Sequence, residues 1–220
     1  MHALKIEKNG AKAIELFREA LALDPTHEDT RYYLATALAA EGNTDAALAE
    51  YAELTRVNSR SHRGIAEWGK LRAMTFRNTG DLAAAEEALA KAHELNPEET
   101  GTLIVLAEVA LMRGDDRLAQ RRLESVCQTN PRAAGALFVL GYLQWKEQHP
   151  DRASQFLDRA RQALGPDWKP AGTTAEGDVR VAARPESTPL SRFWHQWDGP
   201  TAAPARVYAR LDTYLRAIRR

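Results

Sequence analysis

A period of 34 residues runs through most of the sequence, and it constrains the fold more than any other feature. Small, apolar and helix-stopping residues recur at this spacing. Pairs that share it include Ala13 and Ala47, Gly80 and Gly114, Pro97 and Pro131, Leu103 and Leu137, and Ala119 and Ala153. From Ala47 to Ala85 the interval is 38 residues, so we expect one repeat to carry four extra residues, around Ser59–Ile65. A repeat of this length buries its apolar face only against neighbouring copies.

Each repeat is predicted to be two amphipathic helices joined by a tight turn. In the repeat at 100–133, apolar residues recur at steps of three and four, which gives each helix one apolar face. Gly114 is expected to end the first helix, because glycine readily adopts the left-handed conformation there, and Gly42 and Gly80 hold matching positions. Pro131 closes the repeat, since proline cannot continue a helix. Abundant alanine also favours closely packed helices.

These positions resemble the tetratricopeptide repeat family over residues 1–165. The resemblance rests on a small residue in the first helix, a turn glycine, an alanine early in the second helix, a large residue four positions later, and a closing proline. They are Ala35, Ala73, Ala107 and Gly141; Gly42, Gly80 and Gly114; Ala13, Ala47, Ala85, Ala119 and Ala153; Phe17, Tyr51, Leu89, Leu123 and Leu157; and Pro25, Pro97 and Pro131. Ser59 and Gly165 depart from the pattern at closing-proline positions. The resemblance implies an all-α fold, a right-handed α-solenoid of about four and a half helix-turn-helix repeats.

The two ends of the array differ from its middle. The first hairpin is truncated, and a solenoid edge without a polar cap must be covered. A partner, a second copy packing on Leu4, Ile14 and Phe17, or a missing upstream segment would cover it. After Gly165 the period stops, and 166–200 is predicted to be an irregular, proline- and glycine-rich segment.

The C-terminal region carries three further features. Polar and apolar residues alternate over a short stretch within Glu176–Arg184, a weak indication of one short strand. Phe193–Trp197 is an aromatic cluster that is expected to be shielded from water. Residues 201–220 are expected to form a helix that caps the final repeat with its apolar face. The chain from residue 179 onwards holds eight arginines against three acidic residues, so it either folds back on the acidic remainder or stays solvated.

The family resemblance also implies where a ligand would touch. Positions two, five, nine and twelve of each first helix line the concave surface in such repeats. Carried onto this sequence, these positions are Asp29, Tyr32, Thr36 and Ala39; Glu67, Lys70, Met74 and Arg77; Gly101, Ile104, Glu108 and Leu111; and Gly135, Phe138, Tyr142 and Trp145. The residues predicted to bind a partner are Tyr32, Thr36, Lys70, Arg77, Glu108, Phe138, Tyr142 and Trp145.

The last three of these residues form an aromatic stripe, because they stand at i, i+4 and i+7 on one helix face. Two readings remain open. Tyrosine and tryptophan dominate protein interfaces, so the stripe could be a platform for a partner. Alternatively, the chain's own C-terminal segment covers it, since Phe193, Trp194 and Trp197 also need a place to pack. Both hold if a partner displaces that segment.

Other function classes receive little support from the sequence. The six histidines are scattered and there is a single cysteine, Cys127, so no catalytic constellation, metal site or cofactor is expected. Cys127 is expected to be a buried, inert thiol. Thirty basic residues balance thirty acidic ones, and the predicted groove mixes both signs, so nucleic acid is not an expected partner.

The sequence therefore predicts an adaptor, not an enzyme, that binds a peptide or helix of another protein in the concave groove. A self-assembling scaffold built through the N-terminal edge is the alternative, and an accessory portion of a larger assembly is the second alternative. No membrane span or signal peptide is evident, which favours the cytoplasm, although an upstream targeting segment could be missing.

Overall fold

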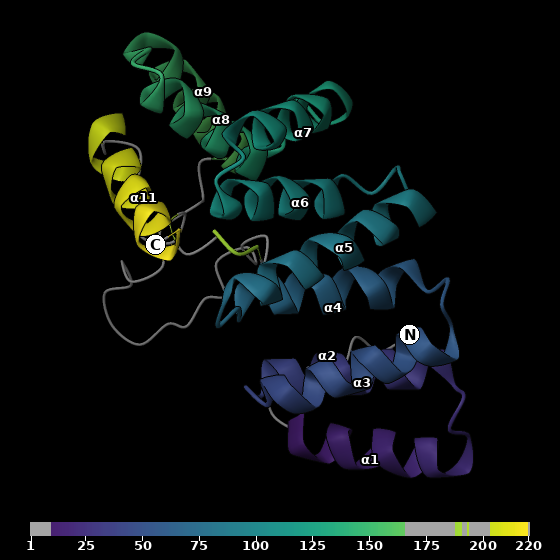
Figure 1. Cartoon of the computed structure of the whole chain (residues 1–220). Helices are drawn as coiled ribbons and strands as arrows, with labels where there is room; N and C mark the ends of the chain where they lie inside the picture. The colour runs from purple at the N-terminus through teal and green to yellow at the C-terminus, as the bar shows by residue number, and fades with distance from the viewer. Residues whose placement is uncertain (1–9, 166–187, 191–192, 194–202, 220) are drawn as a thin grey trace. The chain divides into compact units, whose positions relative to one another are not determined.

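The computed structural model describes residues 10–165, 188–190, 193 and 203–219, which are helical or in turns, with no strand among them (Figure 1). They belong to two compact units, Met1–Pro97 and Glu98–Arg220, called unit 1 and unit 2 below. Unit 1 holds α1 (Gly10–Leu23), α2 (Glu28–Ala40), α3 (Thr44–Val57), α4 (His62–Met74) and α5 (Thr79–Leu95). Unit 2 holds α6 (Thr100–Arg113), α7 (Asp116–Thr129), α8 (Ala134–Lys146), α9 (Pro150–Leu164) and α11 (Pro204–Ile218). The weak strand expected at 176–184 lies outside the described residues.

Consecutive helices pair into hairpins, α2 with α3 and α4 with α5 in unit 1, α6 with α7 and α8 with α9 in unit 2. The repeated alanines explain how closely these partners approach. Ala47, Ala85, Ala119 and Ala153 are all 0% exposed, so there is no room for a larger side chain at the helix contact. The large residues four positions later in the four complete hairpins are buried as well; they are Tyr51, Leu89, Leu123 and Leu157. The predicted all-α repeat fold is confirmed in each unit.

Two of the three predicted turn glycines serve as expected. Gly42 and Gly114 have φ of +79° and +93°, the left-handed conformation that ends a helix. Gly80 does not end a helix, and this prediction is wrong. α4 has already ended at Met74, and Asn78 caps α5 by accepting a hydrogen bond from the backbone N of Asp81 at 3.1 Å. Gly80 therefore lies in the first turn of α5.

The four extra residues of the third repeat also lie elsewhere than predicted. α5 is 17 residues long, and Ala85 is its seventh residue, whereas Ala47 and Ala119 are the fourth residues of 14-residue helices. Most of the insertion is thus an added turn at the start of α5, not an extension around Ser59–Ile65. The small residue that matches Ala35 in α2 is consequently Gly69, not Ala73, because each is the eighth residue of its helix.

The missing proline at Ser59 is compensated by side-chain hydrogen bonds. The Glu28 carboxylate, at the start of α2, accepts one from Asn58 Nδ2 at 2.6 Å and one from Ser61 Oγ at 2.5 Å. These two bonds hold the pKa of Glu28 below its ordinary value, because they stabilise the charged form. The turn between α3 and α4 is therefore tied to the preceding hairpin without a proline.

The C-terminal helix packs on both hairpins of unit 2, whereas a cap on the final repeat alone was predicted. α11 contacts α6, α8 and α9, and its buried side is the expected apolar face of Val207, Tyr208, Leu211 and Leu215. Of the aromatic cluster at 193–197 only Phe193 is described, and its ring lies 5.1 Å from that of Tyr214 between centroids. The proposed division into 1–165, 166–200 and 201–220 stays a prediction.

Candidate functional site

In unit 1 the first helices of the two complete hairpins, α2 and α4, carry a polar and aromatic surface. We call it face 1 and define it by Tyr32, Thr36, Arg63 and Lys70. The guanidinium of Arg63 lies over the Tyr32 ring, 4.3 Å from its centroid, and 3.9 Å from the Asp29 carboxylate. A guanidinium over an aromatic ring is attracted by the ring's negative face, so this pair stabilises the contact between α2 and α4.

The rest of face 1 is joined by shorter polar contacts. Thr36 Oγ1 lies 3.0 Å from the hydroxyl of Tyr51, a buried residue of α3 whose pKa burial raises well above its ordinary value. Lys70 Nζ donates to Glu67 Oε1 at 3.1 Å, and both side chains remain partly exposed. Face 1 therefore presents a tyrosine, a hydroxyl and two cations, of which the Arg63 side chain is half exposed.

Correcting the register of α4 changes which residues belong to this surface. Positions two and nine of α4 are Arg63 and Lys70, so Arg63 was missed and Lys70 moves from the predicted position five to position nine. Arg77 is not on a first helix at all, because α4 ends at Met74. Its guanidinium instead pairs with Asp45 at 3.1 Å beside a small pocket of about 210 Å³.

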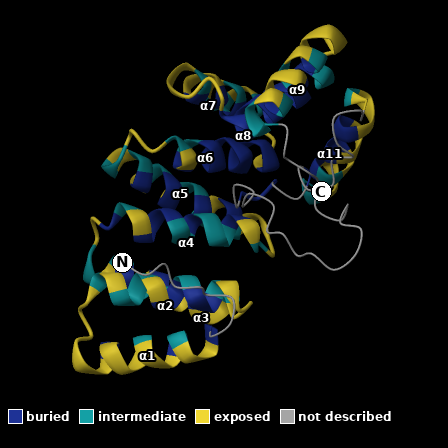
Figure 2. Ribbon diagram, turned by 180° about the vertical axis from the view of Figure 1, so that it is seen from behind, coloured by how far each residue is buried: buried dark blue, intermediate teal, exposed yellow. Residues whose placement is uncertain are grey.

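In unit 2 the corresponding surface is covered by the chain itself. We call it face 2 and define it by Glu108 and Leu111 of α6 and Phe138, Tyr142 and Trp145 of α8. Except for the partly exposed Trp145, these residues are buried, as is most of α8 (Figure 2). The described residues bring α11 and the short stretch 188–190 against them.

One side chain of α11, that of Tyr208, packs against the aromatic stripe. The Tyr208 ring centroid lies 5.5 Å from that of Phe138, 6.2 Å from that of Tyr142 and 6.4 Å from that of Trp145. Tilted and edge-to-face pairs at these distances are favourable beyond the area that they bury. In this structure α11 therefore lies against the stripe, and Phe193 lies against Tyr214 of α11. Packing of Trp194 and Trp197 on the stripe falls outside the described residues, and binding of a partner to the stripe stays a prediction.

Four polar contacts fix the covering segment in place. The Tyr142 hydroxyl donates to Asp212 Oδ1 at 2.9 Å, and burial together with this carboxylate raises the pKa of Tyr142. Glu108 accepts a hydrogen bond from the backbone N of Leu190 at 2.9 Å. Arg219 donates through Nε to the Leu111 carbonyl at 3.1 Å and through Nη2 to Asp116 at 2.9 Å. Sequence periodicity provides no signal for any of these pairs, since their partners are separated by 70 to 108 residues.

The N-terminal edge differs from its prediction in two of three residues. Ile14 is buried in a core cluster with Leu34 and Leu38, and Phe17 packs against the same cluster, so both face the fold. Leu4 lies outside the described residues. The exposed leucines of α1 are instead Leu16, at 54%, and Leu23, at 90%, on a helix that is exposed along most of its length (Figure 2).

Other kinds of site find little support in the part of the chain that the structure describes. These residues contain no group of three or more histidine, cysteine, aspartate or glutamate side chains that could hold a metal ion. Burial raises the pKa of the Cys127 thiol, which favours its unreactive form at neutral pH. None of the described helices combines the length and the apolar character that crossing a membrane requires.

Comparison with known families and structures points to one kind of repeat. Three family models described as tetratricopeptide repeat match residues 4–64, 71–99 and 105–167. A crystal structure of MamA is 18% identical, covers 74% of this chain and 96% of its own, and has a TM-score of 0.63. TTC0263, a thermophilic tetratricopeptide repeat protein from Thermus thermophilus, is 19% identical over 70% of this chain and 82% of its own, with a TM-score of 0.58.

A third solved structure has a partner in its own description. It is the hetero-tetramer Cut9–Hcn1 of the APC/C, in which the matching chain is 20% identical, with a TM-score of 0.59. The match covers 70% of this chain and 30% of that one. No curated protein sequence matches this chain. At these identities the structural likeness concerns the fold alone.

Proposed function

The chain belongs to the tetratricopeptide repeat family, and from this premise we propose that it is an adaptor that binds a peptide or helix of a partner protein on face 1. Repeats of this family are typically modules for protein interaction and not catalysts, and the family and fold support such a role in general. The finer proposal concerns which surface of this chain is available to a partner.

One observation carries the choice of face 1. Tyr32, Arg63 and Lys70 keep part of their surface exposed there, whereas in unit 2 the equivalent Phe138 and Tyr142 are buried and α11 packs against their helix. Tyrosine and arginine are the residue types that supply most binding energy at interfaces. The two cations stand seven residues apart on one side of α4, which suits a partner segment with acidic groups about two helical turns apart.

We expect replacement of Tyr32 and Lys70 by alanine to weaken partner binding about tenfold or more, because hot-spot contacts contribute on the order of 1–2 kcal/mol each. A peptide selected from a random library against the intact chain would serve as ligand, and its dissociation constant would be measured for each variant. Lys91→Ala is the matched control, since Lys91 is an exposed lysine of α5 in the same unit. Unchanged affinity in the Tyr32→Ala, Lys70→Ala variant would contradict the proposal.

Self-assembly is a second candidate, favoured by the two exposed leucines of α1. Leu16 and Leu23 are seven residues apart and so share one side of the helix. If this side joins two copies, light scattering should give a mass above that of one chain, and Leu16→Lys with Leu23→Lys should return it to the single-chain value. A single-chain mass for the unaltered protein across the accessible concentration range would sink this candidate.

A further inference from the structure

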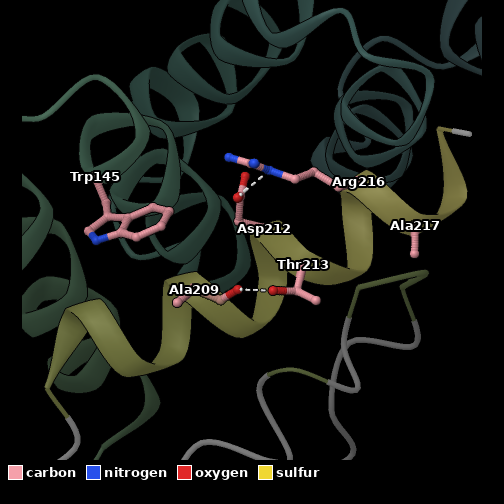
Figure 3. Close-up of a pocket in the computed structure, with 6 residues that line it drawn as sticks. All are labelled: Trp145, Ala209, Asp212, Thr213, Arg216 and Ala217. Atoms are coloured by element: carbon pink, nitrogen blue, oxygen red, sulfur yellow. Dashed lines mark hydrogen bonds and ion pairs between the residues drawn. The ribbon is translucent and has the colours of Figure 1, made fainter.

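A pocket of about 370 Å³ lies beside α11, between this helix and the end of α8 (Figure 3). Its lining consists of Trp145 from α8 and five residues of α11: Ala209, Asp212, Thr213, Arg216 and Ala217. The indole of Trp145 stands on one side, and the short side chains of α11 stand on the other. The pocket is thus an open hollow at the edge of face 2, bordered by Trp145 and by a side of α11 whose residues, apart from Asp212, are exposed.

The sequence of α11 explains why the pocket stays open. Ala209, Thr213 and Ala217 follow one another at four-residue steps, so they form one line of small side chains along the helix. The large side chains of Tyr208 and Leu211 lie on the buried side of α11, next to this line of small residues. Opposite the small residues, the Trp145 indole remains partly exposed, although an aromatic ring of this size is a main source of interface energy.

The polar contacts of α11 define the direction and register of any helix on this face. Asp212 lies at the centre, where it accepts a hydrogen bond from Tyr142 at 2.9 Å and pairs with Arg216 at 2.7 Å. Seven residues later, Arg219 reaches the Leu111 carbonyl at the C-terminal end of α6 and the Asp116 carboxylate at the start of α7. A positive charge is favoured at that end, because the last carbonyls of a helix lack partners.

We propose that face 2 is a helix-binding surface, that α11 is its intramolecular occupant, and that the partner which displaces α11 is an amphipathic helix with the same pattern but a larger apolar residue at the Ala209 or Thr213 position. The pattern is an aromatic residue, a carboxylate four positions later and an arginine eleven positions later, as in Tyr208, Asp212 and Arg219. This surface is separate from face 1, so the inference does not depend on partner binding there.

Filling the pocket would give such a partner the additional affinity that it needs to displace α11. A segment of the same chain competes at an effective concentration on the order of millimolar, so a helix identical to α11 displaces it poorly. A leucine in place of Ala209 adds three carbon atoms beside Trp145, and because Ala209 is exposed only part of the added surface would be buried. At the usual gain per buried carbon, covering about two of these carbons tightens binding by roughly tenfold.

The experiment uses the full chain, labelled with ¹⁵N so that its own α11 differs in mass from any added peptide. Synthetic peptides of residues 203–220 would carry the native sequence, Ala209→Leu, Thr213→Leu or, as a control, Ala205→Leu. Ala205 lies outside the pocket lining, yet the change is the same as at Ala209. Fluorescence anisotropy gives the affinity of each peptide, and hydrogen exchange reports whether residues 204–219 of the chain become unprotected.

We expect the Ala209→Leu or the Thr213→Leu peptide to bind about tenfold tighter than the native and Ala205→Leu peptides, and to unprotect the chain's own α11. We also expect Ala209→Leu in the chain itself to weaken binding of every peptide, because the filled pocket strengthens the occupant. The inference is overturned if the Ala209→Leu, Thr213→Leu and Ala205→Leu peptides bind alike, or if peptides bind while α11 stays protected. A stable dimer that exchanges α11 between copies would equally overturn it, since the occupant would then be a second copy.

Discussion

Replacing Tyr208 by alanine is expected to release α11 from unit 2 while the hairpins of α6 to α9 stay folded. Tyr208 is fully buried, and its ring contacts Phe138, Tyr142 and Trp145, so it is the main apolar anchor of the helix. Removing a buried aromatic side chain costs about 3–5 kcal/mol. That is a large share of the ~5–15 kcal/mol that holds a domain together, and here it acts on one helix.

Hydrogen exchange separates local release from global unfolding. In the Tyr208→Ala variant, residues 204–219 should exchange quickly, while α6 and α8 keep most of their protection. Tyr208→Phe is the matched control, because the buried Tyr208 hydroxyl has no hydrogen-bond partner among the described residues. Deleting an unsatisfied buried hydroxyl should be neutral or slightly stabilising. Native-like protection of α11 in Tyr208→Ala would show that Leu211, Leu215 and the polar contacts suffice to hold it.

The fold was predictable because its information is local and repeated. The alanine early in each second helix and the large residue four positions later recur at steps of 34 residues, with one step of 38, and each reports on a contact within one hairpin. Ala47, Ala119 and Ala153 are fully buried in the structure, as that pattern requires. A solenoid depends mainly on contacts between neighbours, so a periodic sequence describes most of its core.

The surfaces that carry function were less predictable, because they depend on contacts between distant parts of the chain. Nothing in the periodicity indicates that Asp212 meets Tyr142 or that Arg219 meets the end of α6. The aromatic stripe was found by its spacing, but spacing does not say whether a partner or the chain itself covers it. Burial of Phe138 and Tyr142 under α11 came from the structure alone.

The predicted register of α4 was wrong for a different reason. Gly69 and Ala73 are both small and stand four residues apart, on the same side of the helix, so either satisfies the repeat pattern. What decides between them is the cap at Asn78, which starts α5 early and places the extra turn there. Because Gly69 is the small-residue position of the hairpin, Arg63 belongs to face 1, and Arg77, which the sequence predicted as a binding residue, does not.

The corrected register of α4 predicts that Gly69→Val destabilises unit 1 by about 3 kcal/mol. A Cβ atom at Gly69 would lie 2.8 Å from Leu89 Cγ and 3.1 Å from the backbone carbonyl oxygen of Ala85. Leu89 is itself fully packed, and the carbonyl belongs to a helix, so neither neighbour can move without separating α4 from α5. Denaturant unfolding followed by hydrogen exchange in α4 and α5 would measure the loss.

Gly101→Val provides the control, because it makes the same chemical change where there is room. A Cβ atom at Gly101, in the first turn of α6, meets only the Glu99 carboxylate at 3.9 Å. Substitutions at such open positions usually change stability by less than about 0.5 kcal/mol, and valine has a slightly better helix propensity than glycine. If the two variants have similar stability, close packing does not govern Gly69. The assignment of Gly69 as the small-residue position of the hairpin would then be wrong.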